Sequence, residues 1–337
     1  MSAQLPEDYS TADLAADNTF LSQPTHEATG ETQLQLTARV QNAPKAVQEL
    51  LQASIAENTR RAYRSDLAHF LAWGGTIPTQ PEVVAAYLAE WAGRLSVASL
   101  ARRVASISRA HTSQGLKSPT RSDLVAGTLK GIRRTYGVAQ HQVTPILRED
   151  LITMVSDLSG TKGIRDRALL LLGFAGAFRR SELVSLDVET LQFVERGLYV
   201  TLRRSKTDQE GAGRKVAIPF ARGPMCPVRA VKAWLEYAGI TEGAVFRFLS
   251  RHDGLSDARL SSGAVAQVIK LRARQIGLDP AKYSGHSLRA GLITSAARLG
   301  VSVWKIKAQS GHRSEAMVSR YVRDEDLFNN NAAGAVL

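Results

Sequence analysis

The sequence predicts a mainly α-helical protein with a small antiparallel β-sheet, organised as two domains. Apolar residues recur at helical spacing through most of the chain. Apolar residues alternate with other residues, as in a β-strand, in one stretch. There, Leu198, Val200 and Leu202 precede a glycine-containing turn, and Val216 and Ile218 follow it. The 337 residues suffice for two domains of ordinary size. The expected order is a segment 1–44, a helical domain 45–137, a linker 138–145, a mixed domain 146–325 and a tail 326–337.

The first domain shows the pattern of four amphipathic helices. Asn58 is the expected N-cap of the first helix. Thr79 and Glu82 have the spacing of a capping box at the start of the second. The third and fourth helices are expected within 97–114 and 121–136, each with an apolar stripe that turns toward a shared core.

Basic side chains are expected outside those apolar stripes, where they could contact phosphates. The candidates on the third and fourth helices are Arg102, Arg103, Arg109, Lys130, Arg133 and Arg134. Arg204, beside the predicted turn of the sheet, is a further candidate. Such residues are often only a solvated surface, and the formal charge of +12 is what favours an anionic partner such as nucleic acid.

Composition narrows the class of protein further. Residues 1–40 carry six acidic residues and one basic residue, lack steady periodicity and are expected to be disordered. The single cysteine, Cys226, excludes an internal disulfide. The longest apolar run, 168–178, has 11 residues and is too short to cross a bilayer. The acidic N-terminus lacks a signal-peptide core, so a soluble cytoplasmic protein is expected.

Polar residues with possible catalytic chemistry are spread over the second domain. Arg179 follows an apolar helix, and Glu182, three residues on, could hold its guanidinium. "YSGHSLRAG" places His286 and Arg289 three residues apart at the start of another helix. The remaining members are Lys206 in "RRSKTD", His312 in "QSGHRSEAM" and Tyr321, nine residues after His312.

This series, in its order, spacing and local contexts, resembles the tyrosine recombinases, also called lambda-integrase-like enzymes, over about 45–325. The compact layout looks most similar to the Cre-like simple recombinases. The resemblance implies a SAM-like core-binding domain followed by a catalytic domain, closing as a clamp on duplex DNA. It implies six catalytic residues: Arg179, Lys206, His286, Arg289, His312 and Tyr321.

The residue types suit attack on a phosphodiester. Arg179 and Arg289 can donate bidentate hydrogen bonds to the non-bridging oxygens as negative charge spreads over them. His312 can donate one more hydrogen bond, and His286 can exchange a proton near the nucleophile. Lys206 can protonate the departing 5′ oxygen, and Tyr321 can form a covalent phosphotyrosine ester. Two alternatives stay open here: Arg180 adjoins Arg179, and Lys215 lies across the predicted hairpin from Lys206.

The resemblance also implies assembly and biology. The expected activity is site-specific recombination through a 3′-phosphotyrosyl intermediate and a Holliday junction, without metal, ATP or other cofactor. The expected partners are double-stranded DNA and three further copies, a tetramer joined by the tail 326–337. A nucleoid-associated protein of prokaryotic, phage or plasmid origin is expected. Type IB topoisomerase activity, or DNA binding without catalysis, is the alternative.

Overall fold

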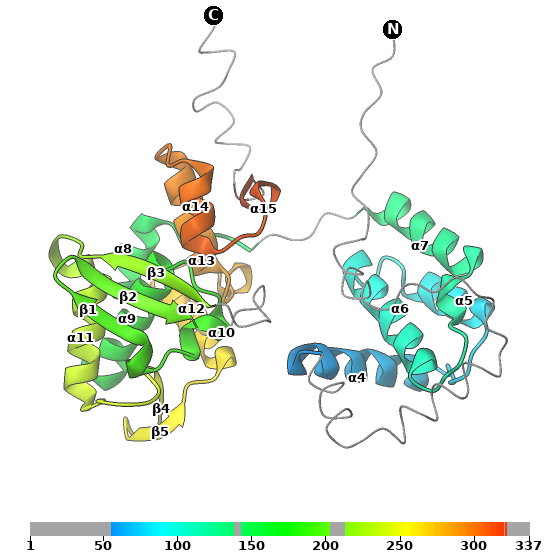
Figure 1. Ribbon diagram of the computed structural model, residues 1–337, viewed down its shortest axis with the longest axis horizontal. Helices are drawn as coiled ribbons and strands as arrows, with labels where there is room; N and C mark the ends of the chain where they lie inside the picture. Colours follow the sequence, from blue (N-terminus) through cyan, green and yellow to red (C-terminus); the bar gives the residue numbers. More distant parts are fainter. Residues whose placement is uncertain (1–54, 138–142, 203–212, 320, 322–337) are drawn as a thin grey trace, which may run out of the picture. The chain divides into compact units, whose positions relative to one another are not determined.

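The computed structural model describes residues 55–137, 143–202, 213–319 and 321. They belong to two compact units, Met1–Gln140 and His141–Leu337, drawn separately in Figure 1. The division falls inside the segment expected to be a linker. Each unit is described by itself.

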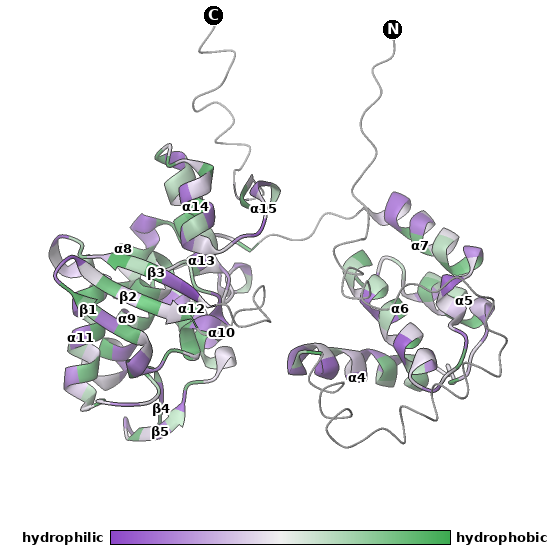
Figure 2. Cartoon of the chain, viewed as in Figure 1, coloured by the Kyte–Doolittle hydropathy of each residue, from purple (hydrophilic) through white to green (hydrophobic). Residues whose placement is uncertain are grey.

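The first unit is a small helical bundle. Its helices are α4 (Glu57–Ala72), α5 (Pro81–Trp91), α6 (Val97–Thr112) and α7 (Asp123–Tyr136), with a short 3-10 turn, η2 (Pro119–Arg121). The side-chain oxygens of Ser96 and Ser122 cap α6 and α7 by accepting from backbone N–H groups in the first turn. Phe70, Tyr87 and Leu100 are fully buried at the centre. Hydrophilic and hydrophobic stretches alternate along α7, as an amphipathic helix requires (Figure 2).

Two predicted helix starts are wrong. Helix α4 begins at Glu57, so Asn58 lies inside the helix and does not cap it. The capping box of Thr79 and Glu82 does not form, because α5 begins at Pro81, whose fixed φ suits the first helical position. The backbone N–H of Thr79 instead donates to His111 Nε2 at 3.0 Å.

The second unit packs helices against one face of a three-stranded sheet. The strands are β1 (Leu191–Val194), β2 (Gly197–Leu202) and β3 (Arg214–Pro219), followed later by the hairpin β4 (Arg247–Leu249) and β5 (Leu255–Arg259). The α-helices are α8 (Arg148–Ser156), α9 (Gly160–Ala175), α10 (Arg180–Val184), α11 (Pro227–Ala238), α12 (Ser262–Gln275), α13 (Ser287–Arg298), α14 (Val303–Ser310) and α15 (Glu315–Ser319). Three 3-10 turns connect them: η3 (Val188–Thr190), η4 (Gly223–Met225) and η5 (Pro280–Lys282).

The alternation seen in the sequence does form a sheet. Strands β1, β2 and β3 pair antiparallel in that order, with Leu198 opposite Ile218 and Val200 opposite Val216. Those four side chains are buried, as the alternation predicts. The predicted mainly helical class with a small antiparallel sheet is therefore confirmed. The hairpin β4–β5 was not predicted, because its three-residue first strand and the loop around Asp253 give too short an alternation to detect.

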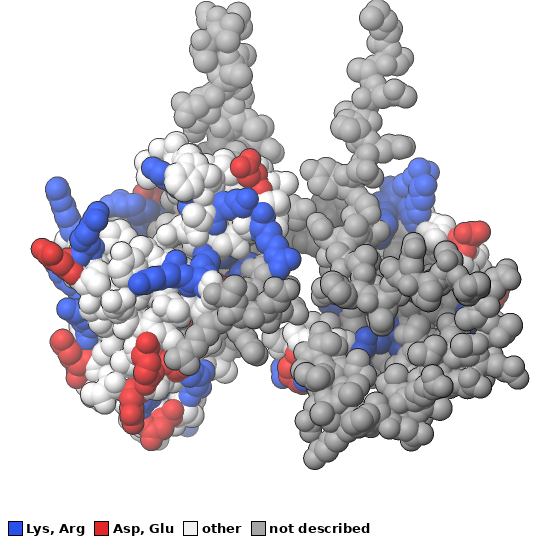
Figure 3. All heavy atoms as spheres, in the orientation of Figure 1, with Lys and Arg blue, Asp and Glu red and all other residues white. Residues whose placement is uncertain are grey.

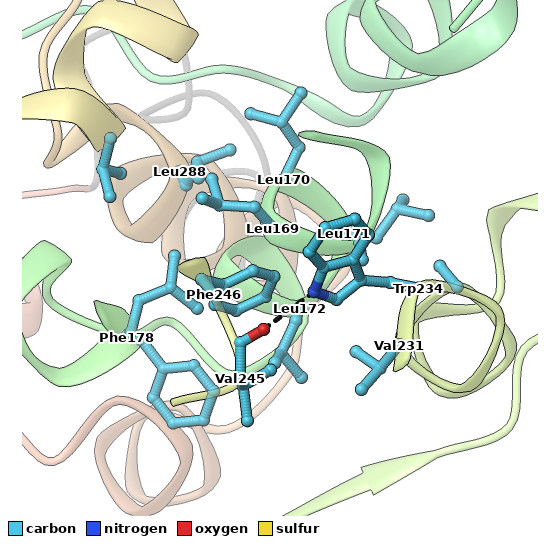
Figure 4. Packing of buried hydrophobic residues seen from close by; sticks show 14 of the residues in the cluster. Leu169, Leu170, Leu171, Leu172, Phe178, Val231, Trp234, Val245, Phe246 and Leu288 are labelled. Atoms are coloured by element: carbon cyan, nitrogen blue, oxygen red, sulfur yellow. Dashed lines mark hydrogen bonds between the residues drawn. The ribbon is translucent and has the colours of Figure 1, made fainter. Parts of the chain in front are cut away.

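The core of this unit forms around the second half of α9, whose residues from Ala168 onward are apolar and mostly buried. Leu169, Leu170 and Leu172 are fully buried, and green hydrophobic segments are visible in β2 (Figure 2). Trp234 of α11 packs here, and its indole N–H donates to the carbonyl of Val245 at 2.7 Å (Figure 4). Within the described ranges, no helix combines the length and apolarity that a membrane crossing needs.

Candidate active site

Arg179 is fixed at the turn between α9 and α10. Its backbone N–H donates to Glu182 Oε2 at 2.9 Å, and its Nη1 donates to Glu182 Oε1 at 2.5 Å. Glu182 is 2% exposed, so its carboxylate is a rigid acceptor for this guanidinium. The neighbouring Arg180 instead lies against Gly285, where an added Cβ would meet its side chain at 2.6 Å. Of the two arginines, Arg179 is therefore the one that the contact with Glu182 holds in place.

Arg289, on α13, is the most deeply buried arginine of the site at 2% exposed. Its Nη1 donates to the carbonyls of Ala177 (2.7 Å) and Ser310 (2.5 Å), and its Nη2 donates to His312 Nε2 at 2.9 Å. Burial, and then the charge of Arg179, lowers the pKa of Arg289 to about 10. The guanidinium therefore stays charged at neutral pH. Ala177 holds its carbonyl in place at a φ of 47°, in the left-handed region that non-glycine residues rarely adopt.

His312 lies in the turn that ends α14. Gly311 adopts a φ of 68°, which ends the helix in a left-handed cap and turns the chain back toward α13. The imidazole is 6% exposed, with Nδ1 2.8 Å from Ser310 Oγ. Burial, and then Arg289 and Arg179, lower the pKa of His312 to about 3. The ring is therefore neutral at physiological pH.

Tyr321 approaches the same place from just beyond α15. Its ring centroid is 5.6 Å from that of His312, with the planes tilted by 47°. The ring packs against the small apolar cluster of Ile293, Ile306 and Val318, which joins α13, α14 and α15. The nucleophile candidate therefore lies beside His312, which itself contacts Arg289 of the same chain.

His286 is the remaining predicted catalytic residue in the described part of the chain. His286 is exposed at the start of α13, one turn before Arg289, and its backbone N–H donates to Ser284 Oγ at 3.1 Å. Lys206 and Arg204 lie outside the described residues. The competing lysine, Lys215, lies on the outer face of β3, where Nζ donates to Gln192 Oε1 at 3.1 Å and sits 4.1 Å from the centroid of the Tyr199 ring.

The sequence analysis missed Arg214, the first residue of β3. Its Nη1 donates to the carbonyls of Gln309 (2.7 Å) and Ala308 (3.3 Å), at the end of α14. Its Nη2 lies 3.9 Å from Glu182 Oε2 and is buried without a hydrogen-bond partner among the residues that the structure describes. Burial lowers the pKa of Arg214. The alternation could have found it, because Arg214 shares the inward face of β3 with Val216 and Ile218.

Among the described residues, the cations of this site outnumber its carboxylates. Three guanidinium groups, from Arg179, Arg214 and Arg289, gather near one buried carboxylate, that of Glu182. Lys and Arg spheres also gather along β3 and beside α15, whereas Asp and Glu gather near β4 and β5 (Figure 3). Fixed cations of this kind stabilise an anion whose charge is spread over several oxygens. The arrangement is suited to a phosphodiester.

In the helical unit, one predicted DNA contact is misplaced. Arg103 is 9% exposed, and its Nη1 donates to the Tyr87 hydroxyl at 2.7 Å and to His69. Arg103 therefore faces the bundle interior, where Tyr87 and His69 contact its Nη1 and the buried Asp66 lies 3.7 Å from its Nε. Arg102 is half-exposed and makes a bidentate contact with Asp66, at 2.7 and 3.0 Å. Of the other candidates, Arg109, Lys130 and Arg134 are exposed and Arg133 is half-buried.

Comparisons with known proteins agree with this geometry. A family profile described as the phage integrase family matches residues 140–327. A protein named integrase/recombinase xerD homolog, from Selenomonas ruminantium, is 38% identical over 88% of this chain and 91% of its own length. The recombinase Cre of Escherichia phage P1 is 23% identical over 74% of this chain and 77% of its own length. Of these two, the likeness to Cre is the weaker.

Solved structures share the fold. XerH site-specific recombinase bound to its difH substrate gives a TM-score of 0.57 at 14% identity, over 92% of this chain and 84% of that chain. A lambda integrase tetramer bound to a Holliday junction gives 0.57 at 16% identity, over 94% and 82%. The two-domain fold of these recombinases is therefore the fold of this chain. Together, the profile and the xerD homolog show that the chain belongs to the phage integrase family, the tyrosine recombinases, which break and rejoin DNA.

Proposed function

We propose that this protein is a site-specific recombinase that cuts and rejoins two duplexes through a 3′-phosphotyrosyl intermediate and a Holliday junction. The observation that carries the proposal is the convergence of Arg179, Arg289, His312 and Tyr321, from four separate elements, on one cationic site. A chain that only bound DNA would not need its buried arginines to converge beside a tyrosine. The relatives' names and titles give the same class of activity.

The proposed chemistry is a transesterification. The Tyr321 oxygen attacks phosphorus, the bond from phosphorus to the 5′ oxygen breaks, and the 5′ end leaves as a hydroxyl. Arg179 and Arg289 stabilise the charge on the non-bridging oxygens, assisted by His312. His286 accepts the phenol proton, and Lys206 donates a proton to the leaving oxygen. Because the ester retains the energy of the broken bond, the second duplex can be joined without ATP.

The two units are proposed to close on duplex DNA as a clamp. Arg109, Lys130, Arg133 and Arg134 of the helical unit would contact phosphates and supply salt-dependent affinity. Side chains of α6 and α7 would read base edges. The working assembly is proposed to be a tetramer on two sites, in the cytoplasm, at the nucleoid.

An apolar groove on the catalytic unit supports the tetramer. It has a volume of about 670 Å³ and is lined by residues of α8, α9, α13, β3 and α14, including Leu151, Phe174, Leu292 and Ile306. The tail 326–337 carries Leu327, Phe328 and Val336, outside the described residues. We propose that the tail of one protomer occupies the groove of the next and so links four copies in a cycle.

The test is strand transfer between duplexes. Genomic DNA fragments of a bacterial host are incubated with the protein, and the mixture is then denatured. The fragments that remain covalently attached to the protein are sequenced to identify the site. Two labelled duplexes carrying that site are then mixed with protein. Recombinant products, absent with Tyr321→Phe, support the proposal. Relaxation of supercoiled plasmid without exchange between sites would favour a topoisomerase, and binding without any covalent adduct would favour a non-catalytic protein.

A further inference from the structure

Ser310, the last residue of α14, contacts two members of the site at once. Its backbone carbonyl accepts from Arg289 Nη1 at 2.5 Å, and its hydroxyl lies 2.8 Å from His312 Nδ1. The residue is completely buried, so water does not compete for either contact. The Ser310 side chain therefore contacts Nδ1, whereas Arg289 contacts Nε2, the other nitrogen of the ring.

These contacts fix the proton on His312. An arginine can only donate, so Nε2, 2.9 Å from Arg289 Nη2, must be the unprotonated nitrogen. The one ring proton is then on Nδ1 and is donated to Ser310 Oγ. In this form, Nε2 has no proton to donate to a DNA phosphate.

A hydroxyl can resolve this conflict because it both donates and accepts. When a phosphate draws Arg289 Nη2 away, His312 can move its proton from Nδ1 to Nε2 while the Ser310 O–H donates to Nδ1. Alternatively, His312 can take a second proton while Ser310 Oγ still accepts from Nδ1–H. In both cases Nε2–H becomes free to donate to the phosphate and Nδ1 keeps a partner.

We propose that Ser310 is a positioning residue that sets the proton arrangement of His312 and lets it change from acceptor to donor when the DNA phosphate arrives. The proposal deepens the proposed function and rests on it for the cleavage step, whereas the proton arrangement of the free protein stands independently. Alanine at this position would leave Nδ1 buried with no partner. The cost of an unpaired buried polar group corresponds to a cleavage rate about 10- to 100-fold lower.

The first measurement is ¹⁵N NMR of the histidine side chains in the DNA-free protein, with the signal of His312 assigned from its loss in His312→Gln. Protonation at Nδ1 in the wild type, and loss of that preference in Ser310→Ala, are expected. An Nε2–H ring in the wild type would overturn the proposal, whatever the outcome of the strand-transfer test.

The second measurement is the rate of covalent adduct formation on a nicked duplex carrying the captured site. It compares wild type, Ser310→Ala, His312→Ala and the double variant. If Ser310 acts through His312, the loss caused by Ser310→Ala disappears in the His312→Ala background. An equal loss in both backgrounds would show a merely structural serine and refute the proposal. If Ser310→Ala does not fold, Ser310→Cys replaces it in the same double-mutant comparison. Cysteine has a similar volume, but its thiol forms only a weak hydrogen bond with His312.

Discussion

At the scale of single residues, burial keeps His312 neutral in the folded protein. Its pKa is lowered to about 3, against 6.5 for an exposed histidine. Between these values the unfolded chain binds a proton that the folded chain does not, so stability rises with pH in this window and is lost as pH falls. The contribution is about 1.4 kcal/mol per pH unit for one group.

The free energy of unfolding is measured with urea at several pH values between 7 and 4. His312→Gln removes the titrating ring, so the loss of stability on acidification should be smaller in this variant than in the wild type. Other groups titrate equally in both proteins and cancel in the comparison. Parallel curves for the two proteins would mean that His312 is not held neutral by the fold.

At the scale of elements, Arg214 ties strand β3 to the end of α14. Replacing it by methionine keeps most of the apolar stem but removes the hydrogen bonds to the carbonyls of Ala308 and Gln309. We expect hydrogen exchange to become faster in 303–312, because the last turn of α14 loses its donors. Lys215→Met is the matched control, since Lys215 is the next residue but faces Tyr199 on the other side of the strand. Equally faster hydrogen exchange in both variants would contradict the role of Arg214 in holding the end of α14.

Two of the arginines on helix α6, Arg103 and Arg109, are expected to affect stability and DNA affinity differently. Arg103→Met should lower the free energy of unfolding, on the order of 2 kcal/mol, because it removes the buried charged donor that Tyr87 and His69 share. Arg109→Met should leave stability unchanged and reduce the slope of log affinity against log salt by about 0.9, one phosphate contact. Chemical unfolding and DNA titration over a salt series separate the two. A salt slope reduced by Arg103→Met but unaffected by Arg109→Met would reverse these roles.

The elements also show what sequence reasoning can reach. Periodic stretches predicted the helices and the pairing of β2 with β3, because burial of one face imposes a repeat that is visible in the chain. The prediction that Asn58 caps the first helix was wrong, because the preference of a residue for a cap position is weak compared with packing. The prediction that Arg103 is exposed was wrong, because a charged residue in a sequence is expected on the surface unless its buried partners, here Asp66 and Tyr87, are known. Arg214 and Ser310 were missed because their contacts join segments about 95 and 21 residues apart.

At the scale of the whole molecule, the proposed assembly depends on the tail. A chain lacking 326–337 should bind and cleave single sites as the wild type does, because Arg179, Arg289 and Tyr321 are intact. It should lose complexes of four copies and strand exchange, because the groove on the neighbouring copy stays empty. Native mass spectrometry on site DNA, beside the exchange assay, measures both. Unaltered recombination by the truncated chain would contradict the proposed cyclic contact.

The account as a whole depends on several distant segments meeting at one phosphate with Tyr321 as the nucleophile. The most direct test traps the protein on a nicked duplex, digests the adduct and identifies the residue joined to the 3′ phosphate by mass spectrometry. We predict that the DNA is attached to Tyr321, and that Arg179→Ala and Arg289→Ala each reduce the adduct by at least about 100-fold without abolishing DNA binding. Attachment to any other residue, or undiminished adduct in the arginine variants, would contradict the account.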